Sequence, residues 1–336
     1  MKKSALYASF FILSIFSTLS FAATFKIATL TPDGSSWMKE MRAGAKEIKL
    51  LTDQRVKFKF YPGGVMGDDK SVLKKIRIRQ LHGGALMGGS FAKFYRDSQI
   101  YNVPLQFRNF AEVDYVRSKM DQAIMDGIEK GGFITFGLAE GGFAYTMSKA
   151  PLTSSPDLIQ RKVWVPNDDK AALEITRAYG ITPIPLALPD VLAGLQTGVI
   201  NTVATSPIGA LALQWHTQVS DITDVPLMYF FATLAIEKKV FFKLSPNDQA
   251  TVRKIMGETF KRIDKQNRKD NVAAMSALQN QGITLSKPSE AELELWYAKA
   301  NTAKQRLIDS NEISTQTMQI FEGHLNTFRN QQTAIH

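Results

Sequence analysis

The stretch from Ser154 to Ser206 constrains the fold most, because three short apolar runs alternate there with two helical patterns. The first run includes Trp164, the last surrounds Val203, and each helical pattern ends at a glycine. Strands that alternate with helices at this spacing typically form a parallel sheet with crossover helices. Ligands of such sheets bind beyond the carboxyl ends of the strands. We therefore expect Trp164, Thr205 and Ser206, which lie at two such ends, to line a pocket.

A second alternation of this kind occupies the N-terminal part of the chain. Apolar runs at 25–30, 56–61 and 85–87 are separated by segments with apolar residues three and four apart, a spacing typical of helices. Two strand–helix–strand units in succession indicate a doubly wound lobe.

A long helical pattern begins at the capping signal Ser245–Pro246 and continues to Gln281. At about 1.5 Å per residue it would be about 50 Å long, more than the width of one lobe, so we expect it to kink or to span both lobes. The sequence therefore predicts an α/β fold of two lobes. The predicted boundaries are 23–141 plus 229–270 for lobe I and 142–228 plus 271–336 for lobe II.

The first 22 residues have the pattern of a secretory signal peptide. A basic start, Met1–Lys3, precedes an apolar run, and Ser20–Ala22 resembles a cleavage site. The run is short for a membrane span, and an uncleaved N-terminal anchor is the alternative interpretation. The absence of cysteine excludes a disulfide framework, a thiol nucleophile and a lipid-modified cysteine. We expect cleavage after Ala22 and a periplasmic location for the remaining chain.

The chain is basic, with a formal net charge of +10, which becomes +8 when Lys2 and Lys3 leave with the signal peptide. A basic surface could attract nucleic acid, anionic lipid or an anionic solute. The densest basic runs, at 74–79 and 261–269, fall on helical patterns without interleaved aromatic residues. We interpret them as solvated helix faces and expect no nucleic-acid partner.

Motifs for catalysis or for cofactor binding are missing from the sequence. It has no GxxxxGK loop, no GxGxxG after a strand, no HExxH and no GxSxG. The four histidines do not fall at metal-ligand spacing, and Asp168 and Asp169 precede a helical pattern, where a capping role is expected. Glu140 is an isolated candidate carboxylate, and the two glycines that follow it within an extended run suit a bend or a crossover. We therefore expect no enzyme, no metal and no cofactor, but a cleft that closes on a solute by hinge motion.

Five segments of the chain carry a family resemblance: Pro62–Gly67, Pro104–Phe107, Ser155–Pro166, Leu195–Asn201 and Ser245–Gln249. Together they resemble the DctP-type solute-binding proteins, which serve tripartite ATP-independent periplasmic (TRAP) transporters. The similarity runs in order through nearly the whole mature chain. It implies the periplasmic-binding-protein fold, in which two α/β lobes, each a sheet flanked by helices, are bridged by a long helix. It also implies delivery of a solute to a membrane permease driven by an ion gradient.

The resemblance also shows where the chain departs from the family pattern. The family usually has, at the position of Trp164, an arginine that pairs with a substrate carboxylate, and a second arginine is common where this chain has Phe143 and Ala144. The polar residue that the family has after the last strand of the opening stretch is Thr205 here. An indole offers an apolar face and one N–H donor but cannot neutralise a carboxylate. We therefore interpret the chain as an atypical branch that lacks the carboxylate-binding arginine.

These departures favour a small hydrophobic or aromatic ligand, captured between the lobes by a monomer and delivered to the TRAP permease subunits. The alternative is a ligand-binding sensor or envelope accessory protein that no longer serves transport, since the same fold can serve either role. For Trp37 and Met87, packing in the core is an equally good interpretation. The candidate ligand-binding residues are Trp37, Met87, Glu140, Phe143, Tyr145, Trp164, Asn167, Thr205, Ser206, Tyr229 and Phe230.

Overall fold

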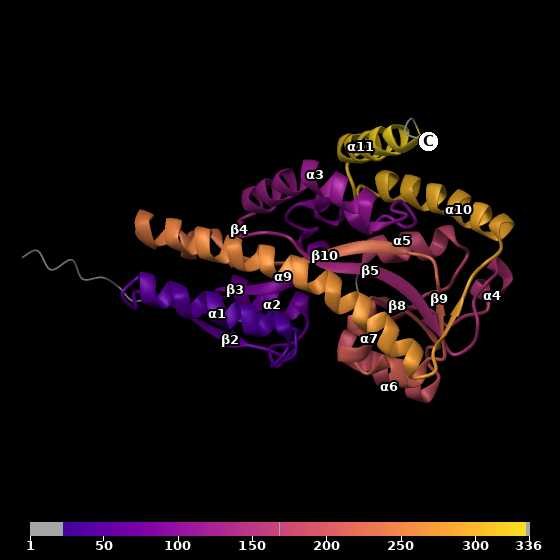
Figure 1. Cartoon of the computed structure of the whole chain (residues 1–336), viewed down its shortest axis with the longest axis horizontal. Helices are drawn as coiled ribbons and strands as arrows, with labels where there is room; N and C mark the ends of the chain where they lie inside the picture. Colours follow the sequence, from indigo (N-terminus) through magenta and orange to yellow (C-terminus); the bar gives the residue numbers. More distant parts are fainter. Residues whose placement is uncertain (1–22, 168, 334–336) are drawn as a thin grey trace, which may run out of the picture.

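The computed structural model describes residues 23–167 and 169–333, which form a long mixed sheet with helices packed around it (Figure 1). The predicted signal peptide at 1–22 and Asp168 lie outside the described residues. The strands are β1 (Ala23–Thr29), β2 (Val56–Tyr61), β3 (Gly83–Met87), β4 (Phe133–Thr135), β5 (Ala139–Ser148), β6 (Trp164–Pro166), β7 (Ile184–Leu186), β8 (Thr202–Thr205), β9 (Asp221–Thr223), β10 (Met228–Glu237) and β11 (Thr284–Ser286). The helices are α1 (Ser36–Leu51), α2 (Asp69–Arg77), α3 (Phe110–Lys130), α4 (Ser155–Ile159), α5 (Lys170–Ala178), α6 (Val191–Thr197), α7 (Pro207–Ala212), α8 (Lys238–Phe241), α9 (Pro246–Asn280), α10 (Glu290–Asp309) and α11 (Thr315–Thr333).

Helices begin where the sequence carries capping residues. The hydroxyl of Ser245 accepts a hydrogen bond from the backbone N–H of Asp248, and Pro246 occupies the first position of α9. The carboxylate of Asp169 accepts one from the backbone N–H of Ala172 at the start of α5. Each cap satisfies a backbone donor that the first turn of a helix leaves without a partner, so these starts are set locally.

The main sheet has the strand order β11-β9-β5-β10-β3-β1-β2, with β4 paired to β10 and β8 paired to β5. Strand β1 runs parallel to both β2 and β3, with α1 and α2 as the crossovers, as the N-terminal alternation predicted. Strands β5 and β10 are each 10 residues long and pair with one another antiparallel. They carry the sheet from the β1–β3 side to the β8–β9 side (Figure 1).

The stretch from 154 to 206 forms a parallel sheet only in part. Strands β6 and β7 pair in parallel, with Trp164 opposite Ile184, but they make a separate two-stranded sheet. Strand β8 runs antiparallel to β5, with Thr205 opposite Tyr145, and meets the first strand of this stretch only at a parallel bridge between Thr202 and Val163. The predicted parallel sheet is therefore not continued along β8. The reason is a long-range pairing, because β5 crosses from the other half of the molecule and its backbone groups pair with those of β8.

Strand β5 bends where the sequence has two consecutive glycines, as predicted. Gly142 has a φ of +96°, which strongly favours glycine, and the pairing with β10 shifts register between Phe230 and Phe231. A Cβ on Gly141 would lie 2.1 Å from the ring of Phe230. Both glycines are therefore needed for the bend and for the close approach of β10.

Helix α9 is a single helix of 35 residues that runs alongside both halves of the molecule (Figure 1). It packs against α1 near one end, against β5 in the middle and against α7 further along. The predicted long bridging helix is therefore confirmed. Within the part of the chain that the structure describes, no helix is both long and apolar enough to cross a membrane.

The largest core cluster joins residues from both predicted lobes. It contains Val116 of α3, Phe143 of β5, Ile175 of α5 and Phe321 of α11. Helix α11, which the sequence places in lobe II, packs against α3 of the predicted lobe I. The division of the chain into two lobes at these boundaries stays a prediction.

Candidate functional site

Glu140 lies at the bend of β5, with only 1% of its surface exposed. Its Oε2 accepts hydrogen bonds from Nε and Nη2 of Arg268, at 2.9 and 2.5 Å, and from the hydroxyl of Tyr229 at 3.3 Å. Burial raises the pKa of this carboxyl group, and the hydrogen bonds from Arg268 act in the opposite direction. The carboxylate therefore ties β5 to α9 and to β10.

A second arginine, which is buried, extends this network. Arg117 of α3 donates from Nη1 to Asp264 at 2.8 Å and to the hydroxyl of Tyr229 at 2.9 Å, and it pairs with Asp121 at 2.9 Å. Its Nη2 also donates to the backbone oxygen of Leu138 at 2.7 Å. Because both carboxylates face the same guanidinium group, Arg117 has no charge left to neutralise a ligand.

Phe143 and Tyr229 lie directly opposite one another on β5 and β10, and their ring centroids are 5.6 Å apart. They are 3% and 0% exposed. The ring of Phe110 lies 4.8 Å from Phe143, and that of Phe107 lies 5.9 Å from Tyr229. The structure thus brings Glu140, Phe143 and Tyr229 together, but inside the core and not at a surface.

Trp164, at the start of β6, is partly exposed. Its Nε1 donates a hydrogen bond to the backbone oxygen of Leu186, at 3.1 Å, and its ring packs edge-on against Trp215 with the centroids 5.2 Å apart. The one hydrogen-bond donor of the indole is therefore already used within the protein. What the side chain still offers to a ligand is apolar surface.

Four further candidates lie on β5 and β8 or just after β6 and β8. Tyr145 and Thr205 lie opposite one another and are partly exposed, and Tyr145 packs against the same core cluster as Trp164. The hydroxyl of Ser206, which is 3% exposed, accepts a hydrogen bond from the backbone N–H of Gly209 and caps α7. Asn167 is exposed, beyond the end of β6.

The remaining candidates belong to the predicted lobe I. Trp37 is 8% exposed and packs against Phe260 of α9, and its Nε1 has no hydrogen-bond partner among the described residues. Met87 is 36% exposed at the end of β3, and Phe230 is partly exposed on β10. The role of all eleven candidates in ligand binding stays a prediction.

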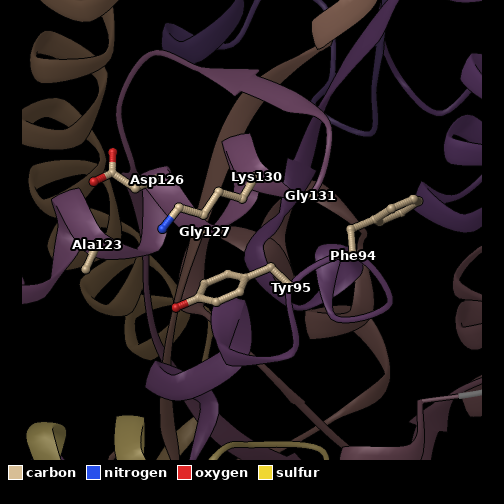
Figure 2. Close-up of a pocket in the computed structure, with 7 residues that line it drawn as sticks. All are labelled: Phe94, Tyr95, Ala123, Asp126, Gly127, Lys130 and Gly131. Carbon is tan, nitrogen blue, oxygen red and sulfur yellow. The ribbon is translucent and has the colours of Figure 1, made fainter.

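Two hollows formed by described residues lie away from these candidates. One, of about 430 Å³, lies beside α3 (Figure 2), and the other, of about 490 Å³, lies between α5 and α10. Figure 2 shows Asp126 and Lys130 of α3 on one side of the first hollow and Phe94 and Tyr95 on the other. None of the eleven candidates lines either hollow. Among the described residues, no group of three or more acidic, histidine or cysteine side chains could hold a metal ion.

Sequence reasoning missed the polar face of α9 that holds the bend of β5. The amide of Asn267 donates to the backbone oxygen of Glu140 at 2.7 Å, and that of Asn271 donates to the backbone oxygen of Gly141 at 3.1 Å. Together with Asp264 and Arg268, these residues are spaced three and four apart, which places them on one face of the helix. A polar stripe within an otherwise amphipathic helix was the available signal.

Comparison with known proteins supports this architecture. Residues 27–311 match the family model DctP, described as bacterial extracellular solute-binding protein, family 7. The chain belongs to this family. Members of this family are solute-binding proteins and not enzymes, and two of the relatives of this chain are named as periplasmic binding proteins.

The chain is 23% identical over 264 residues to the C4-dicarboxylate-binding periplasmic protein DctP of Rhodobacter capsulatus, which covers 77% of each protein. Among the first three curated relatives, the matched region covers 64% to 77% of the relative's length. A TRAP periplasmic solute-binding protein of Ralstonia eutropha with bound (S)-2-acetolactate is similar with a TM-score of 0.81 at 18% identity, over 90% of this chain and 99% of that one. One of Pseudomonas putida with bound D-glucuronate has a TM-score of 0.80 at 20% identity, over 89% and 96%. These structures share the two-lobed fold.

Proposed function

We propose that this chain is the periplasmic receptor of a TRAP transporter, and that it captures a small hydrophobic or aromatic ligand in a cleft between its lobes. The receptor then delivers the ligand to the membrane permease. Family membership and the similarity to TRAP solute-binding proteins support the receptor role. The apparent signal sequence at 1–22 supports export to the periplasm.

The observation that carries the ligand class is the environment of Trp164. Its only donor is bound to Leu186, and Trp215, which is 2% exposed, packs against the ring from the core side. A carboxylate that enters a closing cleft without a counter-charge would lose its hydration and gain no ion pair. An apolar ring placed against Trp164 would instead gain by burial of apolar surface.

Nearby arginines do not replace the missing guanidinium group in this proposal. Arg117 and Arg268, which lie beside the bend of β5, each pair with two carboxylates. Removing Arg268 to bind a ligand would leave the buried carboxylate of Glu140 uncompensated, which is strongly unfavourable. Removing Arg117 would leave the partly buried carboxylates of Asp121 and Asp264 without their counter-charge. The relatives named for a dicarboxylate, or solved with a sugar acid, thus indicate the fold of this receptor, and we propose a different ligand class for it.

Within this site we assign two layers of residues. The partly exposed candidates Trp164, Tyr145, Thr205, Phe230 and Met87 would contact the ligand. The buried candidates would hold the bend of β5 and the adjacent strands in place, and they are Glu140, Phe143, Ser206 and Tyr229.

The test uses the mature chain, Trp164→Arg and Trp164→Ala, titrated calorimetrically with succinate, D-glucuronate, indole and phenylethanol. We expect the unaltered protein to bind the aromatic probes and not the acids, and Trp164→Ala to weaken aromatic binding about tenfold or more, since it removes most of a buried ring face. Trp164→Arg should gain affinity for the acids, because guanidinium–carboxylate pairs are charge-assisted and bidentate.

The matched control is Leu295→Arg, which adds the same charge at an exposed position on α10, where 54% of the leucine surface is exposed. This variant should have the same affinity as the unaltered protein for both ligand classes. Tight binding of succinate or D-glucuronate by the unaltered protein, with no response to the aromatic probes, would contradict the proposed ligand class and leave the receptor role intact.

A further inference from the structure

Almost all of the net charge of the mature chain comes from one segment of it. Residues 23–89 contain 13 lysines and arginines against 6 aspartates and glutamates, a net charge of +7. Residues 90–336 contain 26 against 25, a net charge of +1. In the fold, residues 23–89 form the β1–β3 end of the molecule, coloured indigo, with α1 and α2 (Figure 1). The charge asymmetry therefore belongs to one end of the protein.

Three lysines gather on one face of this end. Lys26 of β1 lies directly opposite Lys59 of β2, and Lys57 lies two residues earlier on the same face of β2. The opposite faces of these strands carry the apolar residues, among them Ile27 and Phe58, that pack into the core. We call Lys26, Lys57 and Lys59 the basic face.

The basic face has no acidic partner among the described residues. None of its three lysines takes part in a salt bridge there, although Lys59 lies over the ring of Tyr61 at 5.4 Å. Like charges directly opposite on neighbouring strands destabilise a sheet. Lysines do protect exposed sheet edges, and β2 is an edge strand. That explanation does not cover Lys26, because β1 lies between β2 and β3.

The kind of basic residue indicates the kind of partner. Arg42 and Arg55, two of the four arginines in residues 23–89, are already paired with acidic side chains of the protein. The lysines of the basic face are compact, hydrated point charges that do not demand a fixed geometry. Protein–protein interfaces are depleted in lysine and enriched in arginine and aromatic residues. A mobile array of lipid phosphates fits this surface better than a folded acidic protein does.

We infer that the basic face of Lys26, Lys57 and Lys59 docks this protein on an anionic lipid surface. The inference rests on the exported location given by the proposed function and goes beyond it. Attraction of each lysine to an anionic bilayer would hold the receptor close to the membrane in which a permease lies. The attraction is electrostatic and fades within about 10 Å at 0.1 M salt, so binding would be reversible.

The test is co-sedimentation of the mature chain with vesicles of phosphatidylcholine alone or of equal parts phosphatidylcholine and phosphatidylglycerol. We expect binding only to the anionic vesicles, and weaker binding as salt is added. Lys26→Gln, Lys57→Gln and Lys59→Gln combined should reduce the affinity on the order of 100-fold, at about fivefold for each lysine near the surface. Lys26→Gln alone should reduce it about fivefold and cannot act through edge protection.

The matched control combines Lys261→Gln, Lys265→Gln and Lys269→Gln on α9, three exposed lysines whose loss changes the net charge equally. This variant should bind the anionic vesicles nearly as well as the unaltered protein. Three outcomes would each overturn the inference. The two triple variants could lose vesicle binding equally, or the unaltered protein could bind free polyglutamate but not vesicles. The basic-face variant could also self-associate while its vesicle binding stays unchanged. Calorimetric ligand titration of the same variants tests the proposed function separately, so a failure of lipid binding can be distinguished from a failure of ligand binding.

Discussion

A single ion pair links two segments that lie far apart in the sequence. Arg55, just before β2, donates to both oxygens of Asp248 in the first turn of α9, at 2.9 and 3.1 Å. Asp248 is 5% exposed and also follows the Ser245 cap. The hydrogen bonds from Arg55 are the main reason that the pKa of the Asp248 carboxyl is lowered.

Asp248→Asn should therefore destabilise the protein in a pH-dependent way. A carboxyl whose pKa is lower in the folded than in the unfolded chain stabilises the fold above the unfolded value, and this stabilisation is lost as the pH falls through the folded value. We expect a loss of about 1–2 kcal/mol at pH 7, between the range for surface pairs and that for buried pairs. The difference from the unaltered protein should shrink towards zero below the ordinary pKa of Asp, about 3.9.

Urea denaturation at neutral and at acidic pH measures this effect. The control is Asp190→Asn, because Asp190 is exposed and its carboxylate makes no capping hydrogen bond at the start of α6. It should change stability by less than about 0.5 kcal/mol at either pH. A loss for Asp248→Asn that is equal at both pH values would show that the carboxylate charge does not contribute.

At the scale of elements, side chains of α9 hold the bend of β5 in place. Asn267 and Asn271 bind the backbone oxygens of Glu140 and Gly141, and Asn271 also accepts the backbone N–H of Ile208 at the start of α7. These contacts satisfy backbone groups that the bend removes from the regular pairing of strands. The bend is therefore held by side chains of one helix.

Gly142→Ala tests this arrangement. A side chain at a φ of +96° is strained, and the added Cβ would lie 2.7 Å from Nδ2 of Asn271. We expect a loss of about 2–4 kcal/mol in the free energy of unfolding, from backbone strain together with the steric clash. Chemical denaturation measures the loss.

The control is Gly323→Ala on α11, where an added Cβ meets no atom within 4 Å. Alanine there should stabilise the protein by about 0.5–1 kcal/mol, because glycine is unfavourable in a helix. If Gly142→Ala were tolerated as well as Gly323→Ala, α9 and β5 would be able to move apart at no cost.

The elements that the sequence predicted are those with local causes. Ser245 and Asp169 act through the next turn of their own helix, and the glycines at 141 and 142 act through their own backbone, so each was visible in the sequence. The antiparallel pairing of β8 with β5 was not visible in the sequence, because it joins residues about 60 positions apart. For the same reason Phe143 and Tyr229 were expected at a cleft and lie in the core: their burial depends on Phe110 and Phe107, which come from elsewhere in the chain.

At the scale of the whole molecule, the C-terminal helix α11 packs back against the predicted lobe I. Asp97 accepts hydrogen bonds from the backbone N–H of Ser314 and from the hydroxyls of Ser314 and Thr317, each at 2.7 Å. Further along α11, Arg329 pairs with Glu112 at the start of α3. The chain thus returns to the predicted lobe I after passing through lobe II, which makes its last helix a structural part of both.

This closure predicts that α11 contributes to global stability and is not a dispensable tail. Phe321 is fully buried, with its ring 5.2 Å from that of Phe107 and 6.3 Å from that of Tyr101. Phe321→Ala should therefore cost about 3–5 kcal/mol, the range for removal of a buried aromatic ring. The adjacent Ile320 is 46% exposed, so Ile320→Ala should cost less than about 0.5 kcal/mol. Thermal and urea unfolding, followed by the fluorescence of the four tryptophans, compare the two variants. A single transition that shifts as a whole for Phe321→Ala supports closure through α11, whereas early loss of α11 alone, with the main transition unchanged, would contradict it.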